Sequence, residues 1–158
     1  MSDSRPASRI ATVVLLFAAT AGAAAESPIA ASAAVSLSFG QVFSGALPGS
    51  VRVSVTGFRS TAGSTYAGNG LGASAARFRV KVPAGTRDSA VWSVMLPVSA
   101  TISSGSTEMT IDGFEYNWVA AGGDPESRTL TVGATLHVGA RQPSSEYAGS
   151  FPLTLVYD

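Results

Sequence analysis

The chain contains no cysteine, one lysine (Lys81) and one histidine (His137) among its 158 residues. The absence of cysteine excludes disulfides and thiolate metal sites, so packing and backbone hydrogen bonds must hold the fold together. Charged residues make up 13% of the chain, and they balance to a formal net charge of zero. This balance provides no electrostatic attraction to nucleic acid or to an acidic membrane surface. We therefore expect no nucleic-acid partner.

Helical periodicity is also missing, because no segment repeats apolar residues at i, i+3 and i+4. Apolar and polar residues alternate instead, in a composition rich in alanine, glycine, serine, threonine and valine. Ala76, Phe78 and Val80, which alternate with Arg77 and Arg79, are the clearest case. Strands are predicted for residues 33–43, 49–58, 75–83, 89–102, 104–120, 129–140 and 150–158.

The predicted strands are short and are separated by turns that contain glycine, serine and proline. About seven to nine such strands, spaced roughly ten residues apart, indicate an all-β, antiparallel β-sandwich. A β-barrel is the main alternative. Residues 59–74, RSTAGSTYAGNGLGAS, are interpreted as a loop because glycine and serine dominate them.

The first 25 residues show the three regions of a signal peptide in order. Arg5 and Arg9 precede the apolar run IATVVLLFAATAGAAA, and the small residues Ala23 and Ala25 allow cleavage after either one. The run is shorter than the ~20 apolar residues of a membrane-spanning helix, which favours cleavage over anchoring. We expect a signal peptide at 1–25, a single domain at 26–158 and no membrane span after cleavage. The protein is then exported to the periplasm, the outer surface or the extracellular medium.

Side chains suited to catalysis do not cluster in the sequence. His137 lies in a strand pattern where a surface imidazole is a simpler interpretation than a general base or a metal ligand. Asp124 and Glu126 lie in the turn GGDPES and provide too few oxygen ligands for calcium. No phosphate-binding glycine motif and no GxSxG motif is present. We expect no enzymatic activity, no cofactor, and no catalytic or metal-binding residues.

Three aromatic residues, Phe114, Tyr116 and Trp118, share one parity in the segment IDGFEYNWVA. Such a row usually packs into a core, but it can also form a platform on which sugars stack. Tyr116 and Trp118 are therefore candidate ligand contacts, together with the predicted loop at residues 59–74.

The segment SFPLTLVYD, residues 150–158, alternates with a period of two. Phe151, Leu153, Leu155 and Tyr157 share one parity, so they would line one face of a strand. We expect these residues to form an edge or core strand of the sandwich.

Two longer segments add a family resemblance. The first segment is residues 37–55, LSFGQVFSGALPGSVRVSV. The second is residues 130–158, LTVGATLHVGARQPSSEYAGSFPLTLVYD. They resemble the opening and closing motifs of a bacterial exported family, domain of unknown function 4402, and the closing motif is the more specific. The likeness covers residues 35–158.

That family is similar in layout to spore coat protein U domains, which include subunits of archaic chaperone–usher pili. The resemblance implies an incomplete immunoglobulin-like β-sandwich that receives a strand from another molecule by strand addition. The donor residues in this chain would be Ile29, Ala31, Ala33 and Val35. The implied partners are further copies of the chain, or a periplasmic chaperone and usher.

We therefore expect a secreted structural or adhesive protein of the bacterial surface, of the fimbrial or pilus type. The alternative is a self-contained β-sandwich of the periplasm or cell surface that binds a carbohydrate or another ligand.

Overall fold

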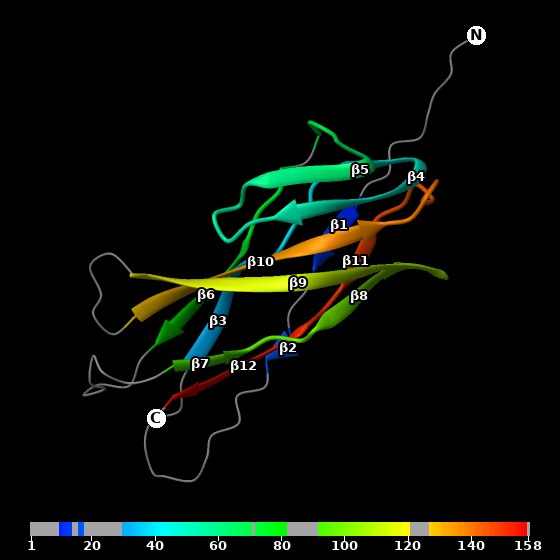
Figure 1. The fold of residues 1–158 in the computed structure, drawn as a ribbon. Helices are drawn as coiled ribbons and strands as arrows, with labels where there is room; N and C mark the ends of the chain where they lie inside the picture. Colours follow the sequence, from blue (N-terminus) through cyan, green and yellow to red (C-terminus); the bar gives the residue numbers. More distant parts are fainter. Residues whose placement is uncertain are drawn as a thin grey trace.

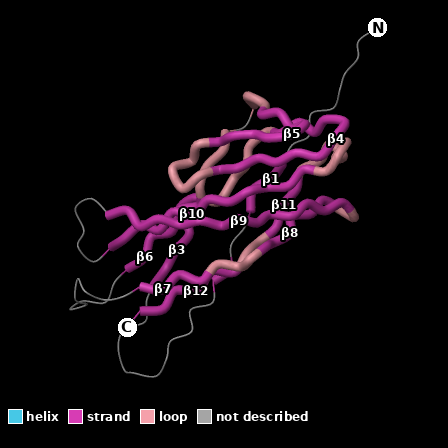
Figure 2. Tube along the Cα trace, in the orientation of Figure 1, coloured by secondary structure: helices cyan, strands magenta, loops and turns pink. Residues whose placement is uncertain are grey.

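The computed structural model describes residues 10–13, 16–17, 30–70, 72–81, 92–120 and 127–157, in which every regular element is a β-strand (Figure 2). The fold is all-β with antiparallel sheets, which confirms the predicted class. The strands are β1 (Ile10–Val13), β2 (Leu16–Phe17), β3 (Ala30–Val35), β4 (Val42–Val53), β5 (Arg59–Ala67), β6 (Ala76–Lys81), β7 (Trp92–Met95), β8 (Ser99–Ser104), β9 (Thr107–Ala120), β10 (Ser127–Val138), β11 (Tyr147–Gly149) and β12 (Pro152–Tyr157).

Strand β10 lies at the centre of the larger sheet (Figure 1). One of its edges pairs with β9. The other edge pairs first with β6 and then with β4, each in antiparallel register. Because β3 pairs with β6 and β5 pairs with β4, the sheet forks into two arms at β10.

Two segments continue from the larger sheet into the smaller one. Strands β7 and β8 follow one another along the chain, and so do β11 and β12. β8 pairs with β11 in the larger sheet, whereas β7 pairs with β12 in the smaller one. Pro97 lies between the first two strands, and Pro152 begins β12. Proline has no N–H to donate to a ladder, so it suits the points where each segment changes sheet.

Every second side chain of many strands contributes to the interior. In β6, Phe78 and Val80 are fully buried while Arg77 and Arg79 are exposed. Burial of one large apolar side chain is worth about 1.5–3 kcal/mol relative to exposure. The largest fully buried side chains are Tyr147, Phe39, Phe78, Phe151, Leu37, Ile102, Ile111, Leu130, Leu136 and Leu153.

A bulge in β9 changes which parity of the strand faces the core. Met109 and Ile111 are buried before it, whereas Phe114 and Trp118 pack against the core after it. Gly113 lies at the change with a φ of 57°, where the register between β9 and β10 shifts. A positive φ favours glycine, so this residue allows the strand to continue beyond the bulge.

The strand predicted for residues 33–43 is interrupted. β3 ends within this range, and β4 begins only at Val42. Gly40 lies between them with a φ of 70°, which regular strand geometry does not allow. Leu37 and Phe39, which lie between β3 and β4, are still fully buried. The predicted alternation therefore places them in the core even though the strand is not continuous.

The interpretation of residues 59–74 as a loop is wrong for their first part. Arg59–Ala67 form β5, which pairs antiparallel with β4. β5 is an edge strand in which Thr65 is the one buried residue, so no apolar alternation marks it in the sequence. The hydrogen-bonded partner, rather than the residue pattern, makes this segment a strand.

The predicted strand at residues 49–58 also ends early, at Val53. The chain then turns, with Ser54 N–H donating to the Phe58 carbonyl at 2.9 Å and Gly57 N–H donating to the Ser54 carbonyl at 2.8 Å. In the other direction this strand extends to Val42, because an irregularity in the β4–β5 pairing absorbs extra residues. Long irregular strands therefore replace part of the predicted set of short ones.

Candidate functional site

The candidate site is built on the β11–β12 segment, which a buried tyrosine positions. Tyr147 is fully buried, and its hydroxyl donates to the Pro143 carbonyl at 2.8 Å. The Gln142 side-chain amide donates to the same hydroxyl oxygen at 3.1 Å and to the Glu108 carbonyl at 3.4 Å. A tyrosine bonded to the backbone a few residues upstream resembles the tyrosine corner of immunoglobulin domains. These bonds fix where the chain enters β11.

One edge of β11–β12 is paired by antiparallel strands. Ala148 and Gly149 pair with β8, and the residues from Thr154 to Tyr157 pair with β7. Phe151 and Leu153, between these two ladders, are buried, and so is Leu155 within the second ladder. The segment is thus held both by backbone pairing on this edge and by its core-facing side chains.

The opposite edge of the segment is covered by residues from the start of the chain. β1 pairs in parallel with β11, at Ile10↔Tyr147 and Val13↔Gly149. β2 pairs in parallel with β12, at Leu16↔Pro152 and Phe17↔Leu153. We call this edge, along residues 147–153, the acceptor edge. β1 and β2 are the only strands on it in the described part of the chain.

The covering strands lie inside the predicted signal peptide. Residues 10–17 have the sequence IATVVLLF, which contains no charged residue, glycine or proline. Figure 1 shows β1 and β2 (blue) beside β11 and β12 (red). An edge strand without its neighbour presents unpaired N–H and C=O groups, which are a template for another chain. Cleavage of the signal peptide would leave the acceptor edge in this state.

The predicted donor residues lie in a different part of the structure. Ala31, Ala33 and Val35 belong to β3, which pairs antiparallel with β6 of the same chain, while Ile29 lies outside the described residues. Ala31 is partly buried and packs against the core, whereas Ala33 is exposed and Val35 is 37% exposed. Backbone pairing therefore accounts for most of what holds β3 in place.

The two candidate ligand contacts differ in exposure. Tyr116 is 45% exposed, whereas Trp118 is partly buried and packs against the core. Phe114, on the same parity, contacts Phe151 with ring centroids 4.8 Å apart and an interplanar angle of 46°. Two of the three aromatic residues are thus used in packing, and Tyr116 is the one with a large exposed surface.

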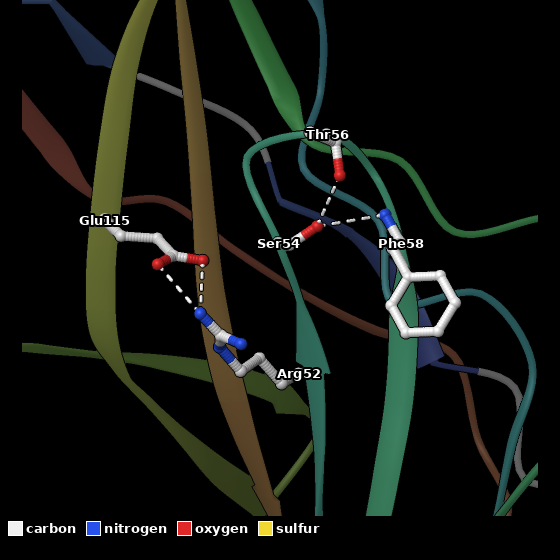
Figure 3. Close-up of polar contacts among 5 residues, drawn as sticks. All are labelled: Arg52, Ser54, Thr56, Phe58 and Glu115. Carbon is white, nitrogen blue, oxygen red and sulfur yellow. Dashed lines mark hydrogen bonds and ion pairs between the residues drawn. The ribbon is translucent and has the colours of Figure 1, made fainter.

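The solvent-facing side of β4, β10 and β9 carries one ion pair and one histidine–carboxylate contact that sequence reasoning did not identify. Arg52 Nη2 lies 2.8 Å from both carboxylate oxygens of Glu115 (Figure 3). His137 Nε2 lies 2.8 Å from Asp112 Oδ1. The partners of each pair come from different strands, 63 residues apart for Arg52 and Glu115 and 25 residues apart for Asp112 and His137, so no local pattern indicates them. Their side chains are about half exposed, and exposed pairs of this kind contribute about 0–1 kcal/mol.

A second polar arrangement in Figure 3 closes the turn after β4. Ser54 Oγ accepts a hydrogen bond from Phe58 N–H at 3.1 Å and lies 2.8 Å from the Thr56 hydroxyl. A serine that bonds the backbone a few residues on stabilises a turn. These residues therefore have a structural explanation and are not grouped around a ligand site.

No group of three or more histidine, aspartate or glutamate side chains that could hold a metal ion occurs among the described residues. Over the same residues, no helix has the length and hydrophobicity that crossing a membrane requires.

Comparisons with known proteins identify the family. No curated protein and no solved structure matched the chain significantly. One family model, described as a domain of unknown function (DUF4402), matches residues 29–157. This range contains the whole described fold except β1 and β2, and it confirms the resemblance seen in the sequence. The chain therefore belongs to the DUF4402 family.

Proposed function

We propose that the mature chain, residues 26–158, is a structural subunit of the bacterial surface that assembles by β-strand addition. The acceptor is the edge of β11–β12, along residues 147–153, and the added strand comes from a second copy of the chain. In this mode of binding, main-chain hydrogen bonds supply affinity while alternate side chains supply specificity.

The pairing of the acceptor edge carries this proposal. β1 and β2 pair with it, and both strands belong to the predicted signal peptide. Without them, β11 becomes an edge of the larger sheet and β12 an edge of the smaller one. A long exposed edge beside buried apolar residues favours association, because each hydrogen bond made there contributes about 0.5–1.5 kcal/mol net.

Strand β3 supports the choice of donor. It lies at the end of one arm of the sheet and pairs with β6 alone. Most of its side chains are small and exposed, so leaving β6 gives up little apolar burial. New backbone pairing at the acceptor edge of a neighbour would offset the lost pairing with β6.

Light scattering on the purified chain 26–158 over a range of concentrations tests the proposal. We expect oligomers whose mass grows with concentration, because the donor and the acceptor lie on different molecules. Deletion of residues 26–36 should leave a folded monomer at the same concentrations, as judged by mass and circular dichroism. Tyr66→Ala, at an exposed position on β5, is the matched control and should assemble like the parent chain.

Two results would count against assembly. The first is a chain 26–158 that remains monomeric at its highest soluble concentration. The second is a deletion variant that is folded and forms the same oligomers as the parent, since residues 26–36 would then not be the donor.

A further inference from the structure

The strands on the acceptor edge follow that edge in one direction. Pairing is parallel in both strands, and from Val13↔Gly149 through Leu16↔Pro152 to Phe17↔Leu153 the offset does not change. A single shift occurs between Ile10 and Val13. Residues 10–13 therefore follow the edge in the larger sheet, and residues 16–17 follow it in the smaller one.

From this pairing we propose that the unprocessed chain closes its own acceptor edge with residues 10–13 and 16–17, and that signal-peptide cleavage opens it. The inference rests on the proposed function, because it names the device that would regulate strand addition at that same edge. It also defines the partner: an uncharged apolar strand that runs parallel to β11–β12.

The chemistry of residues 10–17 suits a strand as well as a leader. Isoleucine, threonine, valine, leucine and phenylalanine fill most of IATVVLLF, and β-branched and aromatic residues favour extended structure. The same run supplies the apolar region that a signal peptide needs. One segment can therefore serve for export and then cover the edge.

Covalent attachment explains why cleavage would act as the switch. While the leader is joined to the domain, its pairing with the edge is intramolecular, and covalent attachment raises its effective concentration there. A peptidase adds water across the peptide bond after Ala23 or Ala25, which gives a leader carboxylate and a new amino terminus. The leader then dissociates by mass action, and a neighbouring strand can take its place.

Cysteine cross-linking of the full chain 1–158 tests the closed state, and the native sequence has no cysteine to interfere. Leu16→Cys with Pro152→Cys places two thiols at paired positions, and Pro152 is exposed. Neighbouring strands lie about 4.8 Å apart, within the Cα separation that a disulfide spans. We expect an intrachain disulfide in the monomer after mild oxidation.

The matched control combines Leu16→Cys with Met95→Cys. Met95 is exposed and pairs with Thr154 from the other side of β12. This control variant should therefore form at least tenfold less intrachain disulfide than the variant with cysteines at positions 16 and 152. Equal cross-linking in both pairs, or none in the first pair while circular dichroism shows a folded chain, would overturn the proposal.

A second measurement uses no substitution. Hydrogen exchange of residues 147–153 should be at least tenfold slower in the full chain than in monomeric chain 26–158. A synthetic peptide of residues 8–19, added in excess to chain 26–158, should restore protection, whereas a scrambled peptide should not. Equal exchange in the two chains would contradict closure of the edge.

The two proposals can fail separately. If chain 26–158 never assembles, the proposed function is wrong even when the cross-link forms. If chain 26–158 assembles but the cross-link and the protection are both missing, assembly stands and closure by the leader is wrong.

Discussion

The rings of Phe114 and Phe151 contact each other in a tilted arrangement, with centroids 4.8 Å apart and an interplanar angle of 46°. Phe114 follows the bulge of β9, and Phe151 lies between β11 and β12. This contact ties the central part of the larger sheet to the point where the β11–β12 segment changes sheet. It therefore fixes the buried side of the acceptor edge.

Truncation of this contact should destabilise the fold. Phe151 is 1% exposed, and removing a buried phenylalanine ring typically costs about 3–5 kcal/mol. Phe151→Ala should lower the free energy of unfolding by that amount in urea denaturation of chain 26–158. Phe58→Ala, at a position that is 72% exposed, should change it by less than about 0.5 kcal/mol. Similar losses in both variants would argue against this packing.

The tyrosine corner gives a second prediction. Tyr147→Phe removes the hydroxyl that donates to Pro143 and accepts from Gln142, and it leaves the ring in place. We expect a loss of about 0.5–1.5 kcal/mol in the free energy of unfolding, because the part-buried hydrogen bonds of the hydroxyl are lost. Exchange of the β11 amides should also accelerate. An unchanged stability would mean that the corner does not position β11.

A third prediction concerns the close approach between β10 and the end of β4. A Cβ added at Gly133 would lie 2.4 Å from the Val53 carbonyl oxygen, and backbone atoms cannot move aside without disturbing the sheet. Gly133→Ala should therefore lower the free energy of unfolding by about 1–3 kcal/mol, the usual penalty of overpacking. Gly72→Ala is the control, since nothing lies within 4 Å of its added Cβ. Thermal unfolding of both variants would compare them directly.

Variants of the aromatic residues on β9 test whether each residue serves core packing or ligand binding. Trp118→Ala should lower the free energy of unfolding by about 2 kcal/mol or more, because this side chain packs against the core. Tyr116→Ala should have a small effect on stability, since Tyr116 is 45% exposed. A glycan array with both variants would test the carbohydrate alternative. Sugar binding that Tyr116→Ala abolishes without loss of stability would favour that alternative over the subunit.

The exposed ion pair of Arg52 and Glu115 should contribute little. Arg52→Ala and Glu115→Ala, alone and together, form a double-mutant cycle for the pair that bonds at 2.8 Å. We expect a coupling energy below about 1 kcal/mol that decreases further in high salt, because both side chains are solvent-exposed. A salt-independent coupling of several kcal/mol would require a buried network that the geometry does not show.

The sequence predicts individual strands, and through them the all-β class, where one buried face makes apolar and polar residues alternate. β6 is the clearest case, since its buried and exposed residues alternate without exception. Alternation does not predict β5, which has polar side chains on both faces and exists because β4 pairs with it. Alternation also misses Gly113, where a positive φ bends a strand that the residue pattern would continue.

The candidate site is less visible in the sequence than the fold. Alternation in SFPLTLVYD indicates a strand, but not which of its edges is paired or by what. The pairing of residues 10–13 and 16–17 with residues 147–153 joins the two ends of the described chain, and no local pattern can indicate such a contact. Tyr147 and Gln142 lie in the family motif, yet only the structure shows the hydrogen bonds between them.

Amide hydrogen exchange on residues 147–153 of chain 26–158, measured at low and high protein concentration, tests strand addition most directly. We predict fast exchange in the dilute monomer and at least tenfold slower exchange in the concentrated sample, because a neighbour's strand then pairs with the acceptor edge. Exchange rates that do not change with concentration, in a sample that light scattering shows to be oligomeric, would contradict assembly through this edge.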